Sequence, residues 1–311
     1  MGSHPKDSHC RPHSRTQSHH SNVERGTSDR SFSTRHDIVE SAESFRGILA
    51  RLEVPCGLLT SVLACYKSCY SVIWLIDNSS SMKVHDSHVV GCTMGVVDHK
   101  DETLHGRLNS FMHGAFHHDR EGRSKIEKRD NVTRWHEIRD CLSFQSYMAA
   151  KCWIRTKLWL VNVDNSGDHK FSLCCGSPED VPDEVSRLKS ALKHATLAQD
   201  RCPLTAQVHN ISRIISDMAP SLNVHDQTLT FIICTQGLPT DKHGTSTHAV
   251  QREFWSELKA LAKLPVRTII RLCTDDKGVS NAYKIMHGRI ESIDVLDDYW
   301  GEVRSSKCSL D

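Results

Sequence analysis

The chain has 311 residues, and its 39 Lys and Arg nearly balance its 38 Asp and Glu, which leaves a formal net charge of +1. This balance gives no bulk electrostatic attraction to nucleic acid or to an anionic membrane. No apolar run approaches the length of a bilayer span, and the amino terminus lacks the apolar core of a signal peptide. We therefore expect an intracellular, cytoplasmic protein with neither nucleic acid nor membrane as a partner.

The cysteine content also favours an intracellular protein. The 13 cysteines are odd in number, and no paired C-x-x-C pattern is present. Without a secretion signal, reduced thiols are favoured over a disulfide framework, and a structural zinc is not indicated. Cys234 and Cys273 lie in apolar runs, which is typical of buried free thiols.

The amino-terminal part changes character along its length. Residues 1–35 are rich in Ser, His, Arg and Gly, and we predict that they are disordered because they contain too little apolar surface to offset the entropy of ordering. Residues 36–69 are predicted to form amphipathic lead-in helices. Apolar residues recur at helical spacing over 36–54, and a further helix or turn is expected over 58–69.

An apolar run over 70–76 is followed at once by Asp77, Ser79 and Ser81. Such a run is typical of a central strand in a parallel sheet, and open α/β sheets place ligands at the carboxyl ends of their strands. Oxygen ligands spaced by two residues suit Mg²⁺ or Mn²⁺. The alternative is that the hydroxyl groups only cap helices.

The following segment, about 84–134, is polar and rich in His, Asp and Lys, and it is predicted to be an insertion or long loop. It could cover the site, contribute to a partner surface, or have no role. Beyond it, strands and helices alternate. The helices are expected at about 135–150, 182–194, 205–218, 247–263 and 281–286, and the strands at 157–163, 170–174, 229–234, 266–273 and 292–296.

This alternation predicts an α/β fold that is doubly wound, with a mostly parallel central sheet and helices on both faces, as in Rossmann-like proteins. The main domain is expected over 70–303, followed by a tail over 304–311.

Three motifs in this order resemble a known family. Asp77-Asn78-Ser79-Ser80-Ser81-Met82 is similar to the D-x-S-x-S motif of the metal-ion-dependent adhesion site in von Willebrand factor A (VWA) domains. Pro203-Leu204-Thr205 resembles the P-L-T segment of that family, and residues 235–240 resemble its T-D-G-x-P-T segment. Together with motifs near the carboxyl terminus, the resemblance extends over about 37–303 and is greatest to uncharacterised VWA proteins of protists and algae.

The resemblance implies a Mg²⁺ or Mn²⁺ site with Asp77, Ser79, Ser81 and Thr205 as ligands and Gln236 as a weakened fifth. Gln236 stands where the family has an aspartate. A neutral amide supplies an oxygen but no charge, so weaker metal binding is expected.

The implied function is that of a metal-dependent protein–protein interaction module, not an enzyme. A protein partner would offer an Asp or Glu to the open coordination position of the ion. One alternative is a metal-independent VWA-like scaffold that has lost the ion through Gln236. Another is a Mg²⁺-dependent hydrolase, although the sequence has no phosphate-binding loop, nucleophile elbow or H-E-x-x-H helix.

Overall fold

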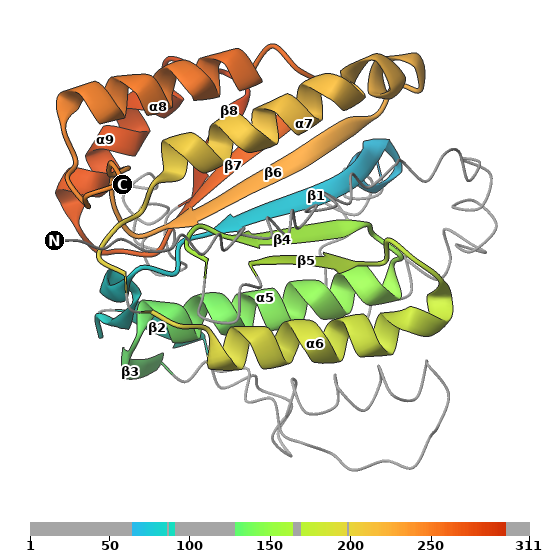
Figure 1. The fold of residues 1–311 in the computed structure, drawn as a ribbon, viewed down its shortest axis with the longest axis horizontal. Coiled ribbons are helices and arrows are strands. Elements are labelled where there is room, and N and C mark those ends of the chain that lie inside the picture. Colours follow the sequence, from blue (N-terminus) through green and yellow to red (C-terminus); the bar gives the residue numbers. More distant parts are fainter. Residues whose placement is uncertain (1–63, 86, 91–127, 164–168, 198, 297–311) are drawn as a thin grey trace, which may run out of the picture. The chain divides into compact units, whose positions relative to one another are not determined.

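A six-stranded sheet forms the centre of the computed structural model, which describes residues 64–85, 87–90, 128–163, 169–197 and 199–296 (Figure 1). The strand order is β5-β4-β1-β6-β7-β8. Neighbouring strands are parallel except for the β4–β5 pair, which is antiparallel. The predicted mostly parallel α/β sheet is therefore confirmed. Its strands are β1 (Cys69–Ile76), β4 (Thr156–Leu160), β5 (Lys170–Leu173), β6 (Thr228–Thr235), β7 (Val266–Leu272) and β8 (Ile293–Leu296).

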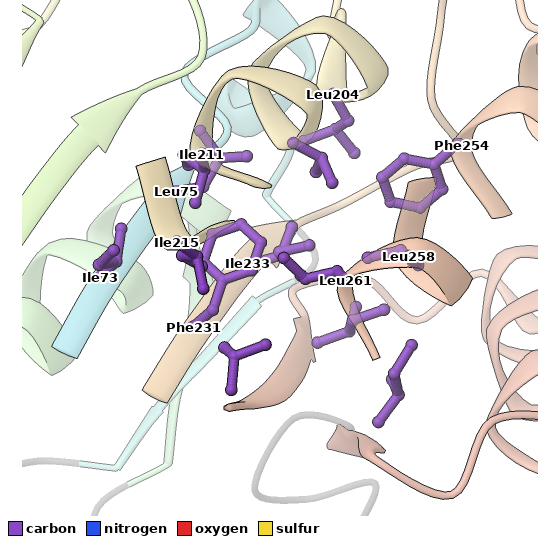
Figure 2. Close-up of a cluster of buried hydrophobic side chains, with 14 of the residues drawn as sticks. Ile73, Leu75, Leu204, Ile211, Ile215, Phe231, Ile233, Phe254, Leu258 and Leu261 are labelled. Carbon is purple, nitrogen blue, oxygen red and sulfur yellow. The ribbon is translucent and has the colours of Figure 1, made fainter. Parts of the chain in front are cut away.

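Helices cover both faces of this sheet, as predicted (Figure 1). Successive residues of a strand point to opposite faces, and β1 follows this rule. Trp74 and Ile76 pack in one cluster with residues of α5 and α6. Ile73 and Leu75 pack in another with residues of α7, α8 and α9, part of which Figure 2 shows. The helices are α5 (Arg134–Lys151), α6 (Val181–His194), α7 (Leu204–Val224), α8 (His248–Leu261) and α9 (Lys277–His287), with short 3₁₀ turns η1 (Ser80–Lys83) and η2 (Pro178–Asp180).

The site region lies where the winding of the sheet reverses. The chain adds β4 and β5 on one side of β1, then crosses over to add β6, β7 and β8 on the other. Ile76 is aligned with Leu160 of β4 and Cys234 of β6, so three parallel strands end at one edge. In doubly wound sheets, the carboxyl edge at such a reversal is the usual place for a ligand.

Two helices are longer than their sequence patterns predicted. α9 begins at Lys277 because the Asp276 side chain accepts hydrogen bonds from the backbone N–H groups of Gly278 and Val279. α7 continues past the predicted end at 218 through Pro220 to Val224, and Leu222 is buried against the core. Capping and packing therefore set these ends more strongly than local periodicity.

The predicted insertion has a structured base that the sequence did not reveal. β2 (Ser87–Val90) and β3 (Lys128–Val132) form an antiparallel two-stranded sheet. β3 leads directly into α5, and the Arg134 backbone N–H donates to the Val84 carbonyl at 3.1 Å. The two ends of the segment are thus joined beside η1.

Several expectations fall outside the described residues. These are the disordered stretch 1–35, the first lead-in helix, the centre of the insertion over 91–127 and the tail over 304–311. Of the second lead-in helix, residues 64–68 are described and are helical. None of the described helices combines the length and apolar character needed to cross a bilayer. The nine described cysteines are all free thiols, and Cys234 and Cys273 are buried as expected.

Candidate functional site

Three segments distant in sequence meet at the carboxyl edge of β1 and β6. The first, residues 77–81, is joined to the second, residues 199–205, by a hydrogen bond from the Ser80 backbone N–H to the Gln199 carbonyl at 2.8 Å. The second is joined to the third, residues 235–240, by a bond from the Cys202 backbone N–H to Thr240 Oγ1 at 2.8 Å. The three predicted motifs are therefore brought together.

Asp77 is the buried centre of the first segment, with 0% of its surface exposed. Its Oδ1 accepts a hydrogen bond from the Ser79 backbone N–H at 2.9 Å. The Thr235 hydroxyl lies 3.3 Å from Asp77 Oδ2 and 3.1 Å from the Gly237 carbonyl, and it has one proton for these two acceptors. Within the described part of the chain, the Asp77 carboxylate forms no ion pair with a basic side chain.

The neighbour of Asp77 in the second segment is Cys202. Complete burial, followed by the charge of the adjacent Asp77 carboxylate, raises the pKa of the Cys202 thiol well above its ordinary value. The thiol is therefore protonated. It can offer Asp77 only a weak S–H hydrogen bond and no positive charge.

Ser79 and Ser81 present a pair of hydroxyl groups, with their Oγ atoms 2.9 Å apart. Ser79 is buried and Ser81 is half-buried. Gln236, from the third segment, donates through Nε2 to Ser81 Oγ at 2.5 Å. Four of the five predicted residues thus belong to one hydrogen-bonded group: Asp77, Ser79, Ser81 and Gln236.

Arg134 completes this group, although no sequence motif pointed to it. Its Nη1 donates to Gln236 Oε1 at 2.5 Å, and the residue is only 7% exposed. A guanidinium group can only donate, so it fixes the amide of Gln236 with the oxygen toward Arg134 and the nitrogen toward Ser81. We call the sequence of contacts from Arg134 through Gln236 and Ser81 to Ser79 the hydrogen-bond relay.

Thr205, the remaining predicted residue, lies in the first turn of α7 and takes no part in the relay. Its Oγ1 is buried and has no hydrogen-bond partner. A buried hydroxyl without a partner is costly, because it has lost its hydration and gained no contact in exchange.

Two asparagines, Asn78 and Asn162, hydrogen-bond the first segment to the segment after β4. The Asn162 backbone N–H donates to Asn78 Oδ1 at 2.8 Å, and Asn78 Nδ2 donates to the Asn162 carbonyl at 3.0 Å. Asn162 Nδ2 in turn reaches the Arg201 carbonyl at 2.8 Å. Asn78, which stands between motif residues, therefore ties the end of β1 to the segment after β4.

A tight turn at Gly244 lies against the backbone of Asp200 in the second segment. Gly244 has φ +83°, and a Cβ placed on it would lie 2.6 Å from the Asp200 carbonyl oxygen. The turn is held by Asp241, whose Oδ1 accepts hydrogen bonds from the backbone N–H groups of His243 and Thr245, and these bonds lower the pKa of its carboxyl. Only a residue without a side chain allows this close approach of the two loops.

Over the described ranges, no group of three or more His, Cys, Asp or Glu side chains is arranged to hold a metal ion. The ligand set implied by the resemblance is of a different kind, since it contains one carboxylate, three hydroxyl groups and the amide of Gln236.

No family model matches this sequence, and no curated protein is significantly similar to it.

Proposed function

We propose that this chain is a protein-interaction module of the VWA type, rather than an enzyme. In this proposal it binds a divalent cation, Mg²⁺ or Mn²⁺, at the carboxyl edge of β1 and β6. An Asp or Glu of a protein partner then completes the coordination of the ion. The observation that carries the proposal is the fully buried Asp77 carboxylate, which has no basic partner among the described residues.

The energetic argument follows from burial. A carboxylate removed from water loses far more hydration energy than hydrogen bonds from neutral groups return, so buried charges are normally paired or bound to metal. The donors to Asp77 are a backbone N–H, a shared hydroxyl and a thiol. A cation at this edge would supply the missing charge.

The proposed ligands are Asp77, Ser79, Ser81 and Thr205. All four offer oxygen, which Mg²⁺ and Mn²⁺ prefer. The unpartnered Thr205 Oγ1 fits this role, because both of its lone pairs remain available. Gln236 fits less well, since its amide oxygen is directed to Arg134. When bound, the ion would present a positive charge that favours acidic over neutral groups of a partner.

A second candidate is a metal-independent scaffold, and the hydrogen-bond relay favours it. The relay joins the first and third segments without an ion and brings a guanidinium group to the site. In such a scaffold, partner recognition would depend on the surface and not on the ion.

The experiment that tests the first proposal is thermal unfolding of the full chain in EDTA and in increasing Mg²⁺ or Mn²⁺. A ligand that binds only the folded state stabilises it by about 2.7 kcal/mol at 100 times its Kd. We expect a concentration-dependent rise in Tm that Asp77→Ala abolishes. Asp294→Ala is the matched control, because Asp294 is an exposed carboxylate of β8 paired with Arg267. If Tm is the same at every metal concentration, both in wild type and in Gln236→Asp, the metal-independent scaffold is the correct interpretation.

A further inference from the structure

The hydrogen-bond relay places a permanent positive charge beside the proposed cation site. Arg134 is buried, so water screens its charge weakly. Its position is fixed at the backbone by the bond to the Val84 carbonyl and by its place in the first turn of α5. The relay then links this guanidinium through one amide to the hydroxyl pair of the first segment.

The orientation of the Gln236 amide has a direct consequence for metal binding. Its oxygen is the one atom of that side chain able to coordinate a cation, and the oxygen accepts from Arg134 Nη1. Its nitrogen faces Ser81 Oγ. While Arg134 holds the amide this way, Gln236 presents a donor to the hydroxyl pair.

The hydroxyl pair is constrained as well. Ser81 Oγ has one proton and two lone pairs, and Gln236 occupies one of the lone pairs. If Ser79 donates to Ser81, the second lone pair is also used, and Ser81 has none left for a cation. If Ser81 donates to Ser79, each oxygen keeps one lone pair. Only one of the two hydroxyl orientations therefore allows both serines to bind an ion.

We propose that Arg134 is a resident cation of this site that competes with the divalent ion. Through Gln236 it holds Ser81 and brings positive charge to the hydroxyl pair, so an added ion binds weakly while the relay is intact and tightly once the Arg134 charge is removed. This inference rests on the proposed cation site. Arg134 is a positioning residue here, because it acts on the ligands through Gln236.

The relay also explains why an amide is tolerated at position 236. With Gln236, the described groups linked by these hydrogen bonds carry one carboxylate, Asp77, and one guanidinium, Arg134. With an aspartate at position 236, two carboxylates would face one guanidinium, and the excess negative charge would favour a bound ion. The neutral residue and the arginine therefore act as a matched pair.

The test is a titration of the full chain with Mn²⁺ as the only metal. Electron paramagnetic resonance measures the concentration of free Mn²⁺ at each step. We expect Arg134→Gln, which removes the charge and keeps an amide donor, to bind Mn²⁺ at least tenfold more tightly than wild type. Arg134→Lys, which keeps the charge, should retain the weak wild-type affinity. The matched control is Arg139→Gln on the same helix, because Arg139 Nε lies 3.7 Å from Asp140 Oδ1 and the residue takes no part in the relay. The affinity of this variant should equal that of wild type.

Circular dichroism identifies any variant that fails to fold. If Arg134→Gln does not fold, Gln236→Ala takes its place, because it frees a lone pair of Ser81 and should tighten Mn²⁺ binding several-fold. An affinity unchanged from wild type in whichever variant folds overturns the inference, as does an equal gain in Arg139→Gln.

The two proposals fail in different ways. If wild type binds Mn²⁺ and Asp77→Ala abolishes that binding, the cation site stands, and an unchanged affinity in Arg134→Gln removes only the role of Arg134. If wild type, Arg134→Gln and Gln236→Asp all fail to bind, both proposals are wrong.

Discussion

Two buried carboxylates of this fold have opposite surroundings. Glu137 of α5 meets Arg271 of β7 at 2.7 Å, so its charge is neutralised inside the fold. Asp77, at the end of β1, meets only uncharged donors among the described residues. A charge balanced within the chain indicates a structural role, whereas one left unbalanced indicates a place where something else is to bind.

Breaking the balanced pair should have the largest effect. Glu137→Gln leaves Arg271 largely buried without its carboxylate, and losing one partner of a buried ion pair costs about 3 kcal/mol or more. Asp77→Asn in EDTA should cost about 1 kcal/mol or less, because it removes a charge that has no basic partner among the described residues while keeping an acceptor for Ser79. Urea unfolding of both variants in EDTA measures the two free energies.

The exposed pair Arg267–Asp294 serves as the control for this comparison. Because both of its side chains are well exposed, Asp294→Asn should change the free energy of unfolding by less than about 1 kcal/mol. A cost for Asp77→Asn as large as that for Glu137→Gln would mean that Asp77 is compensated in the folded chain, and the contrast between the two carboxylates would be lost.

The second prediction concerns the loops that hold Asp77 in place without an ion. Gly244→Ala should lower the free energy of unfolding by about 2 kcal/mol, since it forces a side chain into the left-handed region and against the Asp200 carbonyl. Gly237→Ala is the control in the third segment, where a Cβ meets nothing within 4 Å. We expect its effect to stay below about 0.5 kcal/mol. Equal effects of the two substitutions on urea unfolding would show that the close approach of the loops is unimportant.

The sequence predicted the sheet well because its strands are buried on both faces. Runs such as 70–76 and 229–234 are mainly apolar, with Ser71 and Thr230 as their polar residues, and the helices between them repeat at helical spacing, so pattern alone indicates the architecture. The meeting of the first and third motifs followed from the same topology, since β1 and β6 are parallel and end at one edge. The second motif lies at the start of α7, and the hydrogen bonds of its segment to the other two segments place it at the same edge.

Arg134 and the base of the insertion could not be predicted in the same way. Arg134 lies at the start of a helix after a polar segment, and nothing in its local pattern separates it from a solvated arginine. Its contact with Gln236 spans 102 residues, and such a pairing depends on how β3 and α5 pack against the sheet. The unpartnered state of Thr205 Oγ1 is likewise a property of packing and not of spacing.

The smallest expected effect comes from a third buried carboxylate, Glu184 of α6. It accepts a hydrogen bond from the Cys174 backbone N–H at 2.8 Å, yet burial raises the pKa of its carboxyl above the ordinary value. A raised pKa means that the folded state favours the protonated form. The contribution of Glu184 to stability is therefore greatest below its unfolded pKa and is lost as pH rises through the folded pKa.

Glu184→Gln imitates the protonated form and still offers an oxygen to Cys174. We expect its Tm to exceed that of wild type slightly at about pH 7.5 and to match it near about pH 4, close to the ordinary Glu pKa. Thermal unfolding at the two pH values measures the difference, and a gap in Tm that does not change with pH would contradict the prediction. If the expected result is found, the three carboxylates are ordered by how their charge is met: Glu137 by an arginine, Glu184 in part by a proton, and Asp77, in our proposal, by a divalent cation.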